Sequence, residues 1–200
     1  NNYKELVLLN KQADKETLKY YLSRKKKFPL VLQGNGKFDK FLFKGYEWYD
    51  EYSKITGSTV RKYTGKAIKV EVPFFNQASS STKISVTPAY LIPPQFSEII
   101  DVLKVHQIKF NLLKSEKKVK VEKYRFEDVR FVEKPYEGRQ LLSFKCFSFT
   151  ETVNVEPGTL IVYTNQRQLR VIINLLEPEA PDSFVNWGFF NAFFERKEYA

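Results

Sequence analysis

The sequence predicts a mainly β fold of the α+β class, a β-sandwich with about three peripheral helices. Several segments between residues 28 and 176 alternate apolar and polar residues, which is the period of a half-buried strand. Turn signals such as Asn35-Gly36 and Thr56-Gly57 lie between these segments. Hydrophobic residues make up 42% of the 200 residues and aromatic residues 16%, so the chain has enough apolar side chains for a sizeable core.

Helices are predicted at three places. Residues 3–22 carry apolar side chains at three- and four-residue spacing, which is typical of a helix with one buried face. The prolines at 93 and 94 open a second helix, since proline favours the first turn, and its apolar stripe ends near Gln107. The third helix begins at Asp182 or Ser183, because either side chain can cap a helix.

The strands differ in how clearly they alternate. In residues 68–72 the apolar residues Ile68, Val70 and Val72 alternate with charged ones. Residues 119–126 change parity halfway, which predicts a bulge or a bend. In residues 170–176 nearly every position is apolar, so we expect a central strand that is covered on both faces.

The third helix carries four aromatic residues close together. Trp187, Phe190 and Phe194 are spaced at i, i+3 and i+7, so they share one face of a continuous helix. Burying such rings is favourable, so this face rests either on the sheet, as we favour, or on a neighbouring domain. The predicted packing or docking surface consists of Trp187, Phe190, Phe193 and Phe194.

Positive charge is concentrated in the first third of the chain. The net charge is +10, and residues 1–70 hold 16 Lys and Arg against 7 Asp and Glu. A nucleic-acid partner would need these basic residues to form one continuous stripe, and no RNP-type motif or zinc-finger spacing accompanies them. We therefore expect a solvated face or a surface docked on an acidic neighbour, and no nucleic-acid partner. No run approaches the roughly 18 apolar residues of a membrane span, so none is expected.

Side chains that could perform chemistry are few. The single histidine, His106, cannot form a zinc site alone, and the single cysteine, Cys146, alternates within a strand, so both are expected to be structural. Glu177 and Glu179 flank Pro178 in a turn, where they either bind a cation or, as we favour, are solvated or hydrogen bonded. The sequence predicts no catalytic residue, no metal ligand and no cofactor in this chain.

Several segments resemble bacterial zinc carboxypeptidases of the carboxypeptidase A-like class, in a region that lies downstream of their catalytic domain. The most specific are PGTLIVYTNQ at residues 157–166 and the stretch 169–191. Residues 88–95 and 99–108 also resemble that region, although Gln107 stands where the family usually has glycine. The short stretches FKGY at 43–46 and RKYTG at 61–65 fit the same pattern. The resemblance covers nearly the whole chain and is most specific over residues 157–199.

The resemblance implies that the parent protein releases C-terminal residues from peptides with a zinc-bound water. In that family a His-x-x-Glu pair and a later histidine hold the zinc, and a glutamate acts as general base. None of these matches a position in this chain, so we expect a non-catalytic accessory region. Residues 1–27 would be the helical tail of the upstream catalytic domain, and residues 28–200 a β-rich accessory domain.

The same resemblance implies the partners and the location. The partners are the upstream catalytic domain and, for the parent protein, a peptide substrate, with zinc as the parent's cofactor. The location is secreted or periplasmic, and we expect the natural chain to continue beyond this one. The alternative function is a carbohydrate or cell-wall binding β-sandwich module, in which Tyr46, Trp48, Tyr49 and Tyr52 form a stacking platform.

Overall fold

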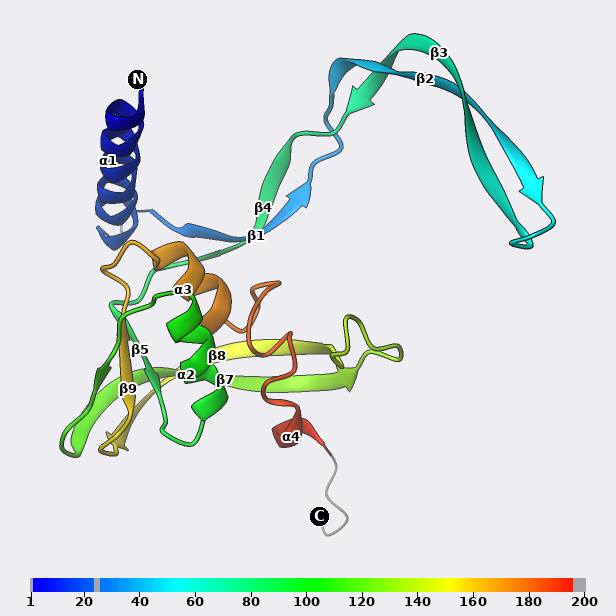
Figure 1. Cartoon of the computed structure of the whole chain (residues 1–200). Helices are drawn as coiled ribbons and strands as arrows, with labels where there is room; N and C mark the ends of the chain where they lie inside the picture. Colours follow the sequence, from blue (N-terminus) through cyan, green and yellow to red (C-terminus); the bar gives the residue numbers. More distant parts are fainter. Residues whose placement is uncertain (1, 24–25, 196–200) are drawn as a thin grey trace. The chain divides into compact units, whose positions relative to one another are not determined.

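The computed structural model describes residues 2–23 and 26–195 and confirms the mainly β class with few helices (Figure 1). The predicted ranges 1–27 and 28–200 therefore include residues outside the described part. The described elements are, in chain order, α1 (Tyr3–Leu22), β1 (Phe28–Gly34), β2 (Asp39–Ser53), β3 (Ser58–Phe74), β4 (Ala78–Ile84), β5 (Ala89–Ile92), α2 (Ser97–Val105), β6 (Asn111–Leu112), β7 (Lys117–Phe131), β8 (Leu142–Val155), β9 (Leu160–Tyr163), α3 (Leu169–Leu176) and α4 (Asn191–Phe194).

The described strands form four small sheets. Three are two-stranded, β1-β4, β2-β3 and β7-β8, and the fourth has the order β5-β9-β6. The predicted pairing of two larger sheets in a sandwich is therefore not confirmed. The first two predicted helices are confirmed as α1 and α2.

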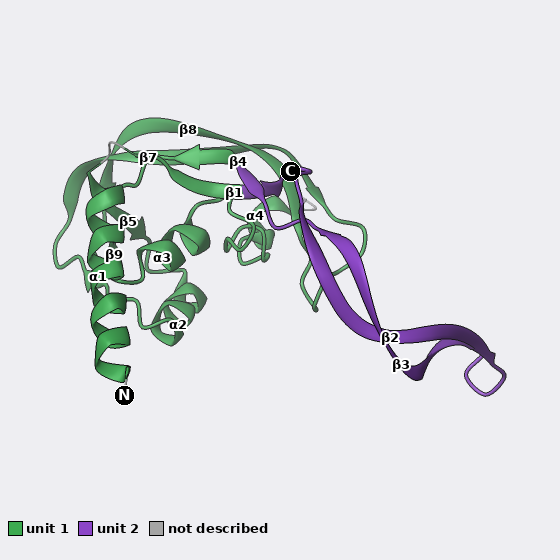
Figure 2. Ribbon diagram, turned by 90° about the horizontal axis from the view of Figure 1, so that it is seen from above, with its two compact units in different colours: residues 1–31, 80–200 green, residues 32–79 purple. Residues whose placement is uncertain are grey.

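The chain divides into two compact units, which Figure 2 shows in different colours. Unit 1 comprises residues 1–31 and 80–200, and unit 2 comprises residues 32–79. The chain leaves unit 1 within β1 and returns to it within β4. The predicted domain boundary at residue 27 stays a prediction.

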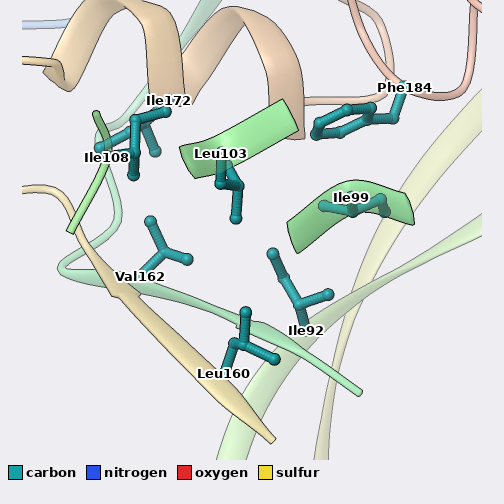
Figure 3. Packing of buried hydrophobic residues seen from close by; sticks show 8 residues of the cluster. All are labelled: Ile92, Ile99, Leu103, Ile108, Leu160, Val162, Ile172 and Phe184. Atoms are coloured by element: carbon teal, nitrogen blue, oxygen red, sulfur yellow. The ribbon is translucent and has the colours of Figure 1, made fainter. Parts of the chain in front are cut away.

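The larger core of unit 1 lies between the three-stranded sheet and two helices (Figure 3). The sheet contributes apolar side chains from β5 and β9, and α2 and α3 cover them. These elements are far apart in sequence, so their helical and strand faces can be buried only by tertiary packing. The buried members are Ile92, Ile99, Leu103, Ile108, Leu160, Val162, Ile172 and Phe184.

A second core cluster joins α1 and β1 to the opposite side of α3. Tyr21 near the end of α1 packs edge-on against Phe28, with ring centroids 5.2 Å apart. Leu169 and Ile173 of α3 are buried in the same cluster. Helix α3 therefore lies between two cores, and most of its apolar side chains are covered.

The predicted strand over residues 170–176 is wrong, because the segment is helix α3. Its β-branched run favours a strand locally. However, Leu169, Ile172, Ile173 and Leu176 recur at i, i+3, i+4 and i+7, which is the helical period. The expectation of a central strand covered on both faces is therefore wrong, although α3 does contact two core clusters.

The predicted continuous helix from Asp182 or Ser183 to Phe194 is also wrong. Turns occupy residues 184–190, and only the single turn α4 is helical. Gly188 has φ +76°, which a right-handed helix does not contain, and a Cβ there would lie 3.0 Å from the backbone oxygen of Gln140. Trp187, Phe190 and Phe194 therefore do not share one helical face.

A bulge or a bend was predicted where residues 119–126 change parity, and the bulge is absent from the described β7. Its register with β8 continues unbroken from Lys117 to Glu127, and the shift comes between Glu127 and Arg130. Asp128 has φ +53° at this irregularity. The half-buried side chains lie on one face of β7 in its first part and on the other face further along, and this explains why the apolar residues change parity.

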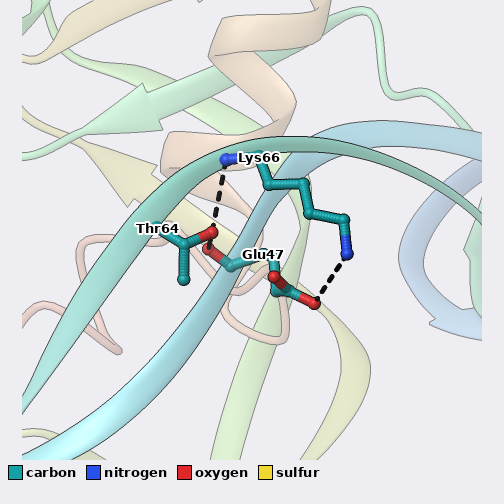
Figure 4. Close-up of polar contacts among 3 residues, drawn as sticks. All are labelled: Glu47, Thr64 and Lys66. Carbon is teal, nitrogen blue, oxygen red and sulfur yellow. Dashed lines mark hydrogen bonds and ion pairs between the residues drawn. The ribbon is translucent and has the colours of Figure 1, made fainter.

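Unit 2 is a long antiparallel ribbon of β2 and β3. Its register is interrupted once, between Tyr46 and Trp48, where the partners change from Ala67 to Tyr63. Figure 4 shows how the extra residues of β3 are held: the Thr64 hydroxyl donates to the Glu47 carbonyl at 3.2 Å, and Lys66 Nζ lies 3.4 Å from Glu47 Oε1. None of residues 32–79, all of which are described, is buried.

Candidate functional site

Unit 1 has a groove between α2, α3 and the turns that follow α3. It has a volume of about 500 Å³, which is within the size range of ligand pockets. Its lining is mainly aliphatic and aromatic and includes four polar side chains. The lining residues are Val102, His106, Arg170, Val171, Asn174, Leu175, Asp182, Phe184, Trp187 and Phe189.

Helix α3 provides the polar wall of this groove. Arg170 and Asn174 lie four residues apart, so they share the face of α3 that is not buried in the core. The Asn174 amide donates to the Arg170 carbonyl at 2.8 Å, which fixes its orientation. The Arg170 guanidinium lies 5.6 Å from the Tyr21 ring centroid and 5.9 Å from that of Phe28, so two rings support the cation.

The opposite wall comes from the turns after α3. Trp187 lines the groove, and its ring centroid lies 6.3 Å from that of Tyr136. Phe189 also lines it, with the Arg139 guanidinium 4.9 Å from its ring centroid. Arg170 and His106 can bind an acidic group, Asp182 a basic one, and the apolar walls an aliphatic or aromatic side chain.

The four aromatic residues of the predicted packing or docking surface make separate contacts. Only Trp187 lines the groove. Phe190 and Phe193 contact Phe96, with ring centroids 5.1 and 5.7 Å apart, and Phe194 contacts Phe126 at 5.3 Å. Phe193 is 68% exposed, whereas the other three are half-buried.

Sequence reasoning missed Arg170, Asn174 and Asp182 as members of this site. Arg170 and Asn174 are four residues apart, which places them on one face of a helix. The segment was predicted as a strand covered on both faces, so this helical face was not recognised. Asp182 or Ser183 was expected to cap a helix, whereas Asp182 lines the groove. His106, expected to be structural, lies at the C-terminal end of α2 and also lines the groove.

A second polar cluster lies in unit 1 around Glu177, which is only 5% exposed. The hydroxyl of Tyr90 donates to Oε1, and that of Tyr124 donates to Oε2 at 2.8 Å. Burial raises the pKa of Glu177, although the two tyrosine hydrogen bonds oppose this shift. Burial also raises the pKa of both tyrosines, and the Glu177 charge adds to this effect.

This cluster agrees with the favoured interpretation of Glu177 as a hydrogen-bonded turn residue. Nearby Cys146 is half-buried, and its thiol pKa is raised to about 11, mainly by burial. Within the described ranges, no three His, Cys, Asp or Glu side chains come together as a metal-binding group. The residues that the structure describes therefore do not fit a zinc ion. None of the described helices is long and apolar enough to cross a membrane.

Comparison with known proteins defines this chain as containing a carboxypeptidase-related region. Carboxypeptidase 2 of Trichophyton rubrum is 32% identical to it over 100 residues, which are 50% of this chain and 19% of the relative. Carboxypeptidase 2 of Trichophyton tonsurans and that of Trichophyton equinum are each 31% identical over the same lengths. The match thus spans about a fifth of the length of these relatives.

Two other comparisons found no match. No protein-family model matches the chain, and no solved structure does. The three relatives are fungal, whereas the resemblance seen in the sequence was to bacterial enzymes. A bacterial source therefore stays a prediction.

Proposed function

We propose that this chain is a non-catalytic C-terminal accessory region of a zinc carboxypeptidase of the carboxypeptidase A-like class. The observation that carries the proposal is the similarity of half the chain to fungal carboxypeptidase 2. The parent protein would release C-terminal residues from peptides in a secreted or periplasmic location. Zinc would be held by residues outside those described here, so no step of the reaction is assigned to this chain.

The groove between α2 and α3 is the proposed docking site for the catalytic domain of the same protein. The relatives extend far beyond the matched part, which covers 19% of their length, so a region of this kind has a large neighbour to contact. The groove combines apolar walls with Arg170, Asn174 and Trp187. An apolar centre with a polar rim is the usual composition of a contact between domains.

The first experiment tests whether the chain is non-catalytic. Purified residues 1–200 should bind no stoichiometric zinc and should release no amino acid from blocked dipeptides. The longer natural protein, assayed in the same way, should bind zinc and should release amino acids from these substrates. One tightly held zinc per chain in the short protein would refute the accessory role, and a longer protein without peptidase activity would refute the enzyme class.

The second experiment tests the docking site in the longer protein. Trp187→Ala removes a groove wall, so the half-life of peptidase activity at a raised temperature should shorten by more than for the control. The control is Phe147→Ala, which removes a ring that is 52% exposed on β8 and outside the groove. Equal half-lives for the two variants would place the contact with the catalytic domain elsewhere.

A further inference from the structure

One face of the unit 2 ribbon carries a row of exposed aromatic side chains. Tyr46, Trp48 and Tyr52 occupy alternate positions of β2, so they point to the same side of the ribbon. Tyr63 lies directly opposite Trp48 on β3 and belongs to the same face. The four side chains are between 47% and 67% exposed. Each offers a flat apolar ring together with a polar group.

A fixed pair of charged groups lies among these rings. Arg61 is paired with Asp50 across the strands, and two hydrogen bonds of 3.1 and 3.4 Å join their side chains. The Arg61 guanidinium lies 3.6 Å from the centroid of the Trp48 ring. The rings are therefore interleaved with planar donors and acceptors that are already oriented.

The same face continues into a shallow groove that carries unneutralised positive charge. Lys44 lies directly opposite Lys69, and like charges in this position repel each other. Other lysines of the ribbon have glutamate partners, as Lys40 does with Glu71. Within the described residues, Lys44 and Lys69 have no such partner. The groove has a volume of about 520 Å³ and is lined by Lys44, Gly45, Tyr46, Ala67, Ile68 and Lys69.

We propose that this face binds an acidic polysaccharide. The binding strip consists of Lys44, Lys69, Tyr46, Trp48, Tyr63, Tyr52 and the Arg61–Asp50 pair. Sugar rings would stack on the aromatic side chains, and their hydroxyl groups would donate to the Asp50 carboxylate. A carboxylate or sulfate on the sugar would lie between Lys44 and Lys69, where it would relieve the repulsion between them.

The opposite face of the ribbon has a different composition. Near its base it carries Phe41, Phe43, Val70 and Val72, which have no polar groups. Side chains of that kind are typical of packing against another layer of protein. The binding strip instead carries tyrosine and tryptophan with charged groups between them, which suits a ligand that is both hydroxylated and charged.

A single-stranded nucleic acid also combines stackable rings with negative charge. It binds to grooves in which many cations follow the phosphate backbone. The strip has two free lysines, and the Arg61 charge is neutralised by Asp50, so few cations are left to follow a phosphate backbone. Because hydroxyl groups are the natural donors to Asp50, the polysaccharide fits the strip better.

The test is a calorimetric titration of the whole 200-residue chain with a galacturonic acid hexamer. Neutral cellohexaose and a 12-nucleotide oligothymidylate are titrated as comparison ligands. We expect the acidic hexamer to bind most tightly and its affinity to fall as salt is added, since exposed charges are screened. Tighter binding of the oligothymidylate would overturn the proposal, and equal binding of cellohexaose would overturn the role of the lysines.

Matched variants on the two faces of the ribbon make the test specific. Trp48→Ala and Lys44→Gln should each weaken binding by about tenfold, as the loss of an anchoring contact does. The controls are Tyr49→Ala, an adjacent ring on the opposite face that is 50% exposed, and Lys62→Gln, whose glutamate partner is on that face. Equal losses for strip and control variants, or no binding of any glycan, would refute the proposal. It is independent of the proposed peptidase role.

Discussion

The β5-β9-β6 sheet of unit 1 and the β2-β3 ribbon of unit 2 both contain many apolar residues, but only the first has apolar side chains that are buried. Leu160 and Val162 of β9 are 1% and 0% exposed, whereas Phe43 and Val70 of the ribbon are 50% and 45% exposed. The difference comes from helices α2 and α3, which cover the short strands. Apolar residues in a strand are therefore buried only where a second layer of structure covers them.

The difference in burial predicts a large difference in stability when the same residue type is truncated in each unit. Leu103→Ala removes a side chain that is fully buried in the main core and should destabilise the chain by about 2–5 kcal/mol. Leu42→Ala removes a side chain that is 53% exposed on the ribbon and should change stability by no more than about 0.5 kcal/mol. Denaturant unfolding measures both. Similar losses would mean that the ribbon is covered in solution.

A second pair of variants sharpens the comparison within unit 1. Phe190 packs on Phe96 at the edge of the main core, so Phe190→Ala should cost about 3 kcal/mol, the lower end of the range for a buried phenylalanine. Phe193→Ala removes an exposed ring and should cost about 0.5 kcal/mol or less. The midpoints of urea unfolding of the two variants measure this difference in stability. A shift near zero for Phe190→Ala would identify its ring as part of an exposed docking surface.

The buried carboxyl of Glu177 predicts that the free energy of unfolding depends on pH. Its pKa is raised in the folded chain, so the folded state holds more protons than the unfolded state above the ordinary glutamate pKa of about 4.3. Stability from this group is complete below that pH and is lost as pH rises through the raised value. The free energy of unfolding of Glu177→Gln should therefore fall less than that of the unchanged chain between about pH 4 and about pH 7.

The control for this pH series is Glu127→Gln, which alters an exposed carboxyl on the same unit. Its pH dependence should follow that of the unchanged chain. Urea unfolding at each pH gives the three profiles. Parallel profiles for Glu177→Gln and the unchanged chain would show that burial of Glu177 has no energetic consequence.

The smallest expected effect is a difference in hydrogen exchange. It needs no substitution and follows from the different burial of the two ends of α1. Leu6 and Leu9 are 62% and 56% exposed, whereas Tyr21 is buried in the second core cluster. Amide hydrogens over residues 6–20 should exchange faster than those of α3, because fewer buried contacts oppose local opening. Hydrogen exchange followed by mass spectrometry measures this. Equal protection of the two helices would show that the exposed leucines have a partner in solution.

The sequence by itself determined the features that depend on local patterns. The mainly β class, helices α1 and α2 and the long strands follow from periodicity, proline positions and turn residues, which act over a few residues. For Glu177 the sequence favoured a solvated or hydrogen-bonded side chain, and only the structure decided between these two, since its tyrosine partners lie 87 and 53 residues away. The resemblance to carboxypeptidases likewise came from the sequence, and the relatives support its coarser form.

Only the tertiary structure decided the secondary structure of segments whose local signals conflict. Val171, Ile172 and Ile173 favour a strand, yet burial of Ile172 in one core and Ile173 in another stabilises a helix. Close approach of the Gln140 backbone to Gly188 ends the helix expected around Trp187. The groove and the binding strip also arise from residues distant in sequence, and their neighbours cannot be read from a pattern that extends over one or two turns.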